Sequence, residues 1–304
     1  MKRHIIHTLD SGAAIKKPFI TIFICLVLLC ACQTTPPAAP VKKAEPKVAL
    51  VLGGGSAKGF AHVGVIRILE QEKIPIHMII GTSAGSLIGG IYASNPDSFQ
   101  LEWSAYKIDR NDILDISIVY SKVGPVQGAK LEAFVERTAK VKKIEDTKIP
   151  FYPIATDLNT GETVTLEKGS LAKAVRASSA IPGIFVPVVF GNRTLVDGGV
   201  TNNIACDVAR QKGANVVIAV NLQKDIKDSD IDSVFDIIGQ SLNIMMYENS
   251  KSKLRYADVV IEPDIKDVPL FDFTKKKMLI EEGMKAARKA IPRIKALIAQ
   301  QGPT

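Results

Sequence analysis

The sequence has little of what metal-binding, disulfide-stapled or nucleic-acid-binding proteins need. Its four cysteines are Cys25, Cys30, Cys32 and Cys206, and three of them crowd one apolar run, so neither a paired zinc-ligand spacing nor a disulfide framework is present. We expect no metal and no cofactor. The 39 Lys and Arg outnumber the 31 Asp and Glu, but they form no dense stripe with interleaved aromatics, which argues against nucleic acid as a partner. The modest basic excess suits an anionic lipid surface or an ordinary solvated one.

Histidine is missing where an ordinary hydrolase would need it. Ser83 stands in the stretch Gly-Thr-Ser-Ala-Gly over residues 81–85, directly after an apolar run. This Gly-x-Ser-x-Gly pattern is typical of a nucleophile elbow, a sharp strand-to-helix turn whose glycines avoid crowding. An α/β-hydrolase orders its triad as serine, acid, histidine, but all four histidines precede Ser83. If Ser83 is a nucleophile, we therefore expect its base to be a carboxylate.

A glycine-rich loop, Gly-Gly-Gly-Ser-Ala-Lys-Gly over residues 53–59, follows a short apolar segment. Consecutive glycines leave backbone N–H groups unshielded, and at a helix N-terminus such donors suit an oxyanion. A nucleotide phosphate loop is the alternative. However, Lys58 precedes Gly59 rather than following it, and the Gly-x-Gly-x-x-Gly spacing is not met either.

Two aspartates are candidates for the base. Asp197 opens an Asp-Gly-Gly stretch at the end of a short predicted strand, where a carboxylate could accept the Ser83 proton and the glycines would permit a close approach. By itself Asp-Gly-Gly is more often a simple turn. Asp157, in Ala-Thr-Asp, is the rival carboxylate.

Apolar strands alternating with helical periodicity predict an α/β domain with a parallel sheet. We expect residues 101–128 to form a cap or lid near the site, Asn202 or Asn203 to cap the helix that follows, and Gly213 to end it. Strands are expected over residues 48–52, 77–80, 151–156, 194–196, 216–220 and 257–261. Helices are expected over 60–72, 83–93, 131–141, 171–178, 204–212, 234–247 and 274–300, the last interrupted near Pro292.

The three motifs, in their order along the chain, resemble the patatin-like phospholipases, particularly the bacterial branch. The stretches Phe60–Val65 and Ala177–Pro182 are also similar to that family. The resemblance covers residues 48–205 well and the remainder more loosely. It implies a three-layer α/β/α sandwich with a mostly parallel central sheet.

The resemblance also implies roles for individual residues. Ser83 would be the nucleophile and Asp197, favoured over Asp157 on this ground, the proton acceptor. The amides of Gly53, Gly54 and Gly55 would form the oxyanion hole. Lys58 would supply a supporting charge, although it replaces the family's more frequent arginine and loses the planar fork.

The expected function is a serine acyl hydrolase that releases fatty acids from membrane phospholipids or lysophospholipids. Two alternatives are a thioesterase or acyltransferase that uses the same Ser-Asp dyad, and a non-catalytic lipid-binding lipoprotein of the envelope.

The N-terminus is typical of a targeting segment. Lys16 and Lys17 precede an apolar run over residues 18–32. This run is shorter than a bilayer-spanning helix, which needs about 20 residues. Leu-Cys-Ala-Cys over residues 29–32 is similar to the lipobox of bacterial lipoproteins. That likeness implies a signal peptide over 1–31 and lipidation at Cys32, with Cys30 the weaker candidate and an uncleaved signal anchor the alternative.

Two further expectations complete the domain plan. Gln33, where an aspartate would retain a lipoprotein at the inner membrane, implies the outer membrane, facing the periplasm. Residues 32–47 are rich in proline and alanine and predict an extended tether, and residues 48–304 form the hydrolase domain.

Overall fold

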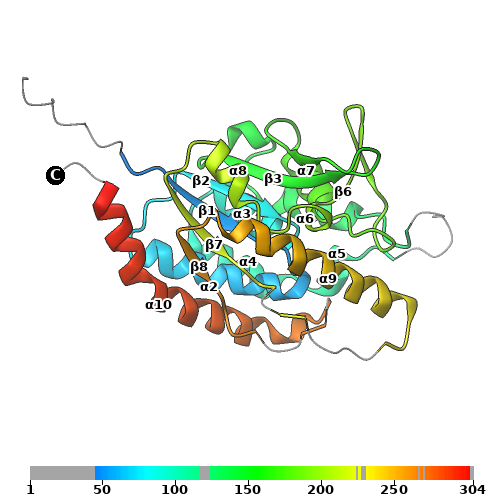
Figure 1. Ribbon diagram of the computed structural model, residues 1–304. Helices are drawn as coiled ribbons and strands as arrows, with labels where there is room; N and C mark the ends of the chain where they lie inside the picture. The colour runs from blue at the N-terminus through cyan, green and yellow to red at the C-terminus, as the bar shows by residue number, and fades with distance from the viewer. Residues whose placement is uncertain are drawn as a thin grey trace, which may run out of the picture. The chain divides into compact units, whose positions relative to one another are not determined.

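The computed structural model describes residues 45–116, 124–223, 225–226, 231–265, 268–269 and 271–301 (Figure 1). The predicted signal peptide, Cys32 and the predicted tether up to residue 44 lie outside the described residues. Within the described part of the chain, no helix combines the length and the apolar character needed to cross a membrane.

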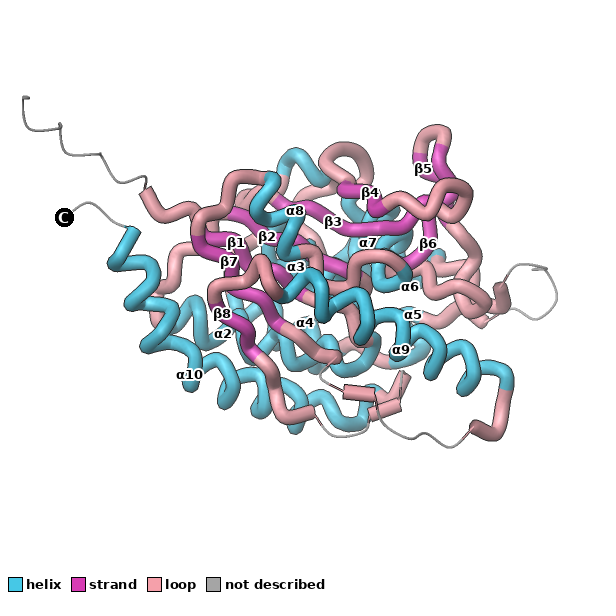
Figure 2. The backbone as a smooth tube through the Cα atoms, in the orientation of Figure 1, coloured by secondary structure: helices cyan, strands magenta, loops and turns pink. Residues whose placement is uncertain are grey.

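A twisted sheet runs through the middle of the domain, in the strand order β5-β6-β3-β2-β1-β7-β8, with β4 paired to β3 (Figure 2). Neighbours from β3 to β8 along this order are parallel, whereas β4, β5 and β6 pair antiparallel at one edge. The mostly parallel sheet is therefore confirmed. The strands are β1 Val48–Leu52, β2 Met78–Thr82, β3 Phe151–Asp157, β4 Thr163–Thr165, β5 Val188–Phe190, β6 Arg193–Asp197, β7 Val216–Val220 and β8 Val259–Ile261.

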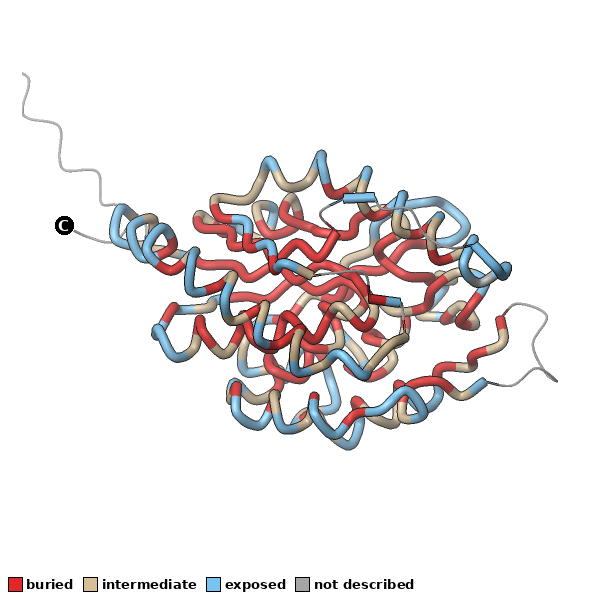
Figure 3. The backbone as a smooth tube through the Cα atoms, turned by 90° about the horizontal axis from the view of Figure 1, so that it is seen from below, coloured by how far each residue is buried: buried red, intermediate tan, exposed pale blue. Residues whose placement is uncertain are grey.

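Helices cover both faces of the sheet because its central strands are apolar on both sides. In β1, Leu50 and Leu52 join the larger core, on the side of the sheet covered by helices that include residues 60–71, 84–94 and 276–301, while Ala49 and Val51 join the smaller core, under the helix of residues 206–211. Figure 3 shows the buried strands at the centre and exposed residues along the outer helices. The helices are α2 Phe60–Gln71, α3 Ala84–Ser94, α4 Ser98–Lys107, α5 Arg110–Ile113, α6 Ala129–Thr138, α7 Leu171–Ser178, α8 Cys206–Gln211, α9 Val234–Leu254 and α10 Lys276–Gln301, with 3-10 turns η1 Ser56–Gly59, η2 Ile144–Asp146, η3 Gly198–Val200 and η4 Phe273–Lys275.

The predicted interruption near Pro292 is wrong, because α10 continues through it to Gln301. Proline removes one N–H donor and ordinarily breaks a helix. Here Ile291 and Ile294 are buried on either side of it, in the core that α10 shares with α2. That tertiary packing outweighs the local penalty.

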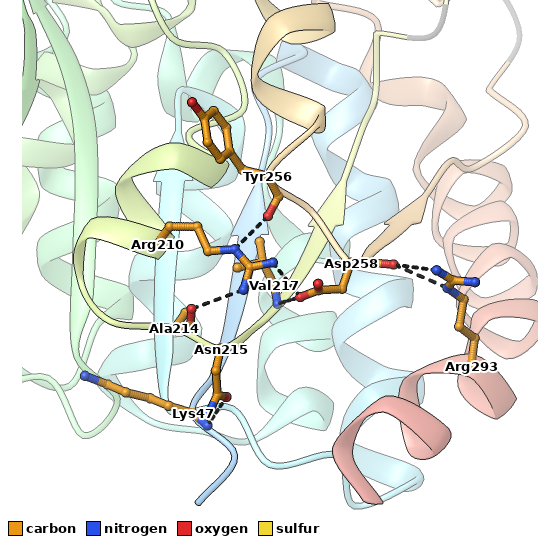
Figure 4. Close-up of polar contacts among 8 residues, drawn as sticks. All are labelled: Lys47, Arg210, Ala214, Asn215, Val217, Tyr256, Asp258 and Arg293. Atoms are coloured by element: carbon orange, nitrogen blue, oxygen red, sulfur yellow. Dashed lines mark hydrogen bonds and ion pairs between the residues drawn. The ribbon is translucent and has the colours of Figure 1, made fainter. Parts of the chain in front are cut away.

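A polar network closes the amino ends of the parallel strands (Figure 4). Arg210 of α8 donates to the Tyr256 carbonyl oxygen at 3.0 Å and to Asp258 at 2.8 Å. The Asp258 carboxylate also accepts the Val217 N–H at 2.7 Å, and Arg293 of α10 donates to the Asp258 carbonyl oxygen. These contacts tie α8, β7, β8 and α10 together at the end of the sheet opposite Ser83.

Candidate active site

Ser83 lies in a sharp turn between β2 and α3, which confirms the predicted strand–turn–helix context. Its φ is 53° and its ψ is −120°, a conformation that non-glycine residues rarely adopt and that a functional constraint often maintains. A Cβ on Gly85 would lie 2.1 Å from the Leu52 carbonyl oxygen, and one on Gly81 would lie 2.6 Å from the Gly85 carbonyl oxygen. Both flanking glycines are therefore required by close backbone approaches.

Strand register brings Asp197 to the same edge of the sheet as Ser83. Thr82, at the end of β2, pairs with Ile154 of β3, and Asp197, at the end of antiparallel β6, pairs with Ala155. The residue after β2 and the last residue of β6 thus flank β3 at one level. The Ser83 amide donates to the Ser178 hydroxyl at 3.0 Å, and this hydroxyl in turn donates to the Ile154 carbonyl oxygen at 2.6 Å.

Asp197 is almost wholly buried, with 1% of its surface exposed. Burial raises its pKa from 3.8 to about 6, against the lowering effects of the nearby Ser83 hydroxyl and of the Gly199 N–H. The Gly199 N–H donates to Asp197 Oδ1 at 2.7 Å, whereas Asp197 Oδ2 has no hydrogen-bond partner among the described residues. One carboxylate oxygen is therefore fixed and the other is open to a proton.

The rival carboxylate, Asp157, is engaged elsewhere. It forms an ion pair with Arg193 at 3.2 Å and accepts the Asn159 N–H at 3.0 Å. These partners lie on the antiparallel side of β3 and hold a turn there. The arrangement leaves Asp197 as the carboxylate that the Ser83 hydroxyl influences.

The glycine loop lies against Ser83, because a Cβ on Gly54 would sit 3.2 Å from the Ser83 Cβ. Two of its three amides are already used. Gly53 N–H donates to the Val220 carbonyl oxygen at 3.2 Å, and Gly54 N–H donates to Asn203, both to Oδ1 at 3.0 Å and to the carbonyl oxygen at 3.3 Å. This corrects the expectation of three free oxyanion donors: Gly55 N–H alone of the three has no acceptor among the described residues.

Asn203 does not cap a helix, so that prediction is wrong, and neither does Asn202: α8 begins only at Cys206 and has no side-chain cap. Asn203 instead binds the glycine loop, because its Oδ1 and its carbonyl oxygen accept the Gly54 N–H. Its own N–H donates to Asn249 of α9 at 2.9 Å, and its Nδ2 donates to Ser250 at 3.1 Å. Sequence reasoning missed this role because no local pattern links residues so far apart.

Helix α9 also reaches the turn that carries Asp197. Asn249 Nδ2 donates to the Gly199 carbonyl oxygen at 2.8 Å. Met246, one turn earlier, is buried against the same region, because a Cβ on Gly199 would lie 3.0 Å from its sulfur. Through Asn203 and Gly199, α9 therefore contacts the segments on both sides of Ser83.

The two described histidines take structural positions. His62 is buried in α2 and its Nε2 donates to the Gly53 carbonyl oxygen at 2.7 Å. Burial lowers its pKa to about 4, so the ring is neutral at physiological pH. His77 Nδ1 accepts the Val48 N–H at 3.0 Å. His62 thus fixes the glycine loop from behind, and neither ring is hydrogen-bonded to Ser83 or Asp197.

An apolar pocket opens beside Ser83. Among the described residues on its wall, serines, including Ser83 and Ser179, are the only ones with polar side chains. The segment expected as a cap or lid contributes to the wall through α4 and α5. The apolar lining includes Leu87, Ile88, Leu101, Ile108, Ile113, Phe134, Phe185 and Phe273.

Lys58 lies in η1 and lines a second, larger cavity next to this pocket. Within the described residues, no three His, Cys, Asp or Glu side chains are arranged to hold a metal ion. Ala84, at the first position of α3, is on the wall of the apolar pocket, and its N–H has no acceptor among the described residues.

The fold and the site define a mixed α/β protein with an elbow serine and a buried aspartate at one sheet edge. The chain belongs to the patatin-like phospholipase family, whose sequence profile matches residues 50–210. The fold is similar to that of VipD from Legionella pneumophila, with a TM-score of 0.53 at 13% identity, over 86% of this chain and 68% of that one.

Curated relatives are mostly much longer. A patatin-like phospholipase domain-containing protein of Caenorhabditis elegans is 31% identical over 80% of this chain, but over only 20% of its own length. Patatin-like phospholipase domain-containing protein 6 of Homo sapiens is 33% identical over 58% of this chain and 13% of its own. An uncharacterized NTE family protein of Mycobacterium tuberculosis is 33% identical over 68% of this chain and 57% of its own. The chain therefore spans a fifth or less of the first two relatives.

Proposed function

We propose that the protein is a serine acyl hydrolase in which Ser83 is the nucleophile and Asp197 the proton acceptor. The observation that carries the proposal is the pairing of a strained elbow serine with a buried aspartate that has one unpaired oxygen. Burial also supports it, because a base whose pKa is raised to about 6 accepts a proton more readily than an exposed carboxylate does.

The proposed reaction has two stages. Asp197 takes the hydroxyl proton as Ser83 Oγ attacks the ester carbonyl, and the collapse of the tetrahedral intermediate expels the alcohol, which receives that proton. Water then transfers a proton to Asp197 and attacks the acyl-enzyme. The bond between the acyl carbon and Ser83 Oγ breaks, the fatty acid leaves, and Asp197 returns the proton to Ser83 Oγ. The unengaged amides of Gly55 and Ala84 are the proposed oxyanion donors, the second of them at a helix N-terminus.

The proposed substrates are phospholipids or lysophospholipids. The apolar pocket beside Ser83 supports a fatty acyl chain as the group that is bound, because it offers almost no polar partner to any other. A thioester would place the same carbonyl in the same position. We therefore keep a thioesterase or acyltransferase as the second candidate.

The test is fatty-acid release by the wild type, Ser83→Ala and Asp197→Asn from phosphatidylcholine, lysophosphatidylcholine, a short-chain ester and an acyl thioester. We expect release from the lipid esters by the wild type alone. Preference for the thioester would favour the second candidate. Equal release by Ser83→Ala would overturn the dyad, and absence of release together with vesicle binding would favour a non-catalytic lipid-binding protein.

We also propose that the chain is a lipoprotein anchored through Cys32 to the outer membrane, facing the periplasm. The basic residues before an apolar run of residues 18–32 support this, as does the Leu-Cys-Ala-Cys stretch. The proline- and alanine-rich residues 32–47 would let the domain reach the membrane that holds it.

A further inference from the structure

A large cavity of about 1660 Å³ adjoins the apolar pocket. It begins at Gly55, beside the elbow, and shares Phe271 and Phe273 with the apolar pocket. Its wall includes α5 with Leu114 and Ile116 after it, the first half of α9, and described residues between β8 and α10. The two cavities are therefore neighbours, and Ser83 lies on the wall of the apolar pocket.

Exposed aliphatic side chains lie on the wall of this cavity and on the chain next to it. Ile116 and Ile226 line it and are themselves exposed. On either side of Asp236, which lines the cavity from α9, Val234 and Ile237 are 69% and 52% exposed, and Ile231, just before the helix, is exposed as well. We call these five residues the rim. Clustered apolar exposure of this kind marks an interaction surface more often than a chance arrangement.

Helix α9 is apolar on two sides, which is unusual for a helix at a surface. Its inner side buries Leu242 and Met246, while Val234 and Ile237 face water. From Val234 to Tyr247 its only charged residue is Asp236. A third side of the helix is polar, because Asp236, Gln240 and Asn243 line the cavity. A surface helix normally turns its polar residues to water, so the exposed apolar side of α9 lacks the cover that its composition predicts.

Charge limits what can cover the rim. The cavity wall carries side chains of both signs, among them Lys58, Arg110, Asp236 and Asp272, and neither sign dominates. This balance matches a zwitterionic head group better than an anionic one. A folded protein bound at the rim would block the entrance of the cavity, whereas a lipid surface would supply lipid molecules to it.

We propose that the rim docks the protein on a zwitterionic phospholipid surface, with Val234 and Ile237 entering its apolar region. The proposal rests on the proposed function, because it explains how a lipid reaches the pocket. Each methylene exposed to water costs about 0.8 kcal/mol, so a long acyl chain cannot cross open water cheaply. With the rim embedded, the chain passes from the bilayer into the cavity and on to the apolar pocket.

The test compares Val234→Ser/Ile237→Ser with the matched control Val189→Ser, whose side chain is 62% exposed on β5, outside the cavity wall. Each is made in a Ser83→Ala background, and co-sedimentation with phosphatidylcholine vesicles is measured. Binding then requires no turnover, so failure of the proposed catalysis cannot mimic failure of docking. The same substitutions with Ser83 intact are assayed on vesicles and on a water-soluble short-chain ester.

We expect the rim variant to lose about tenfold in vesicle affinity, with a similar loss in hydrolysis of vesicle lipid. The rim variant should hydrolyse the soluble ester at the wild-type rate, and the control variant should match the wild type in vesicle binding and hydrolysis. Vesicle binding should persist when NaCl rises from about 0.05 to about 0.5 M. Wild-type affinity in the rim variant would overturn the proposal. So would an equal loss in Val189→Ser, or binding that requires anionic lipid and disappears with salt.

Discussion

Replacing Asp197 with asparagine should abolish fatty-acid release and also make the folded protein more stable at neutral pH. Burial raises the pKa of this carboxyl from 3.8 to about 6. Each tenfold change in an ionisation constant is worth about 1.4 kcal/mol, so holding the ionised carboxylate in the fold costs about 3 kcal/mol. Asparagine avoids this cost. Its side-chain oxygen can still accept the Gly199 N–H, which in the wild type donates to Asp197 Oδ1 at 2.7 Å.

The gain should depend on pH in one direction. Near pH 4 the folded wild type keeps this carboxyl protonated, so the two proteins should have similar free energies of unfolding. Between about pH 4 and about pH 6 the unfolded chain ionises this carboxyl while the folded wild type still holds its proton, so the wild type loses stability across this range and no more above it, while the asparagine variant does not. The difference should therefore grow to about 3 kcal/mol by about pH 8.

Urea unfolding of both proteins from about pH 4 to about pH 8 measures this difference, alongside turnover of a soluble ester. Asp157→Asn is the matched control, because Asp157 is also buried but is paired with Arg193 at 3.2 Å. It should lower stability and leave turnover largely intact. The reasoning would be refuted if Asp197→Asn gave no gain in stability, or if the gain were the same at every pH.

Four further predictions follow from the same structure. The log of kcat/KM for a soluble ester should fall below about pH 6, because protonated Asp197 cannot accept a proton; a flat profile from about pH 4 to about pH 8 would contradict this. Gly54→Ala should lower kcat about 10²-fold with little change in circular dichroism, because its methyl group would lie 2.6 Å from Asn203 Oδ1 and push the loop from Ser83; near-normal turnover would count against the loop. Arg210→Met should lower the free energy of unfolding by about 1–3 kcal/mol while kcat per folded molecule is unchanged, since its contacts lie at the opposite end of the sheet; an unchanged urea midpoint would argue against the network. Cys32→Ala should move the protein from the membrane to the soluble fraction and remove the lipid mass; membrane retention would favour an uncleaved signal anchor instead.

The sequence predicts well the features that depend on residues close together along the chain. A tight turn between a strand and a helix leaves its mark within five residues, so the elbow at Ser83 could be located without the fold. The termination of α8 near Gly213, which has a φ of +84°, is equally local. The central strands were also predictable, because β1 and β7 are apolar on every residue.

Long-range pairing is what the sequence could not predict. Asp197 reaches the Ser83 edge only because β6 runs antiparallel beside β3, and no pattern within β6 states that direction. Because asparagine commonly caps helices, the local sequence predicts a cap at Asn202 or Asn203. The actual partners of Asn203 are Gly54 and Asn249, which lie far away along the chain.

The most direct test of the dyad is to trap the nucleophile. Wild type, Ser83→Ala and Asp197→Asn are incubated with a fluorophosphonate probe, and the modified peptide is identified by mass spectrometry. We expect one adduct on Ser83 in the wild type, none in Ser83→Ala and much slower labelling in Asp197→Asn. An adduct on another serine, or labelling of Ser83→Ala at the wild-type rate, would contradict the assignment of Ser83 as the nucleophile.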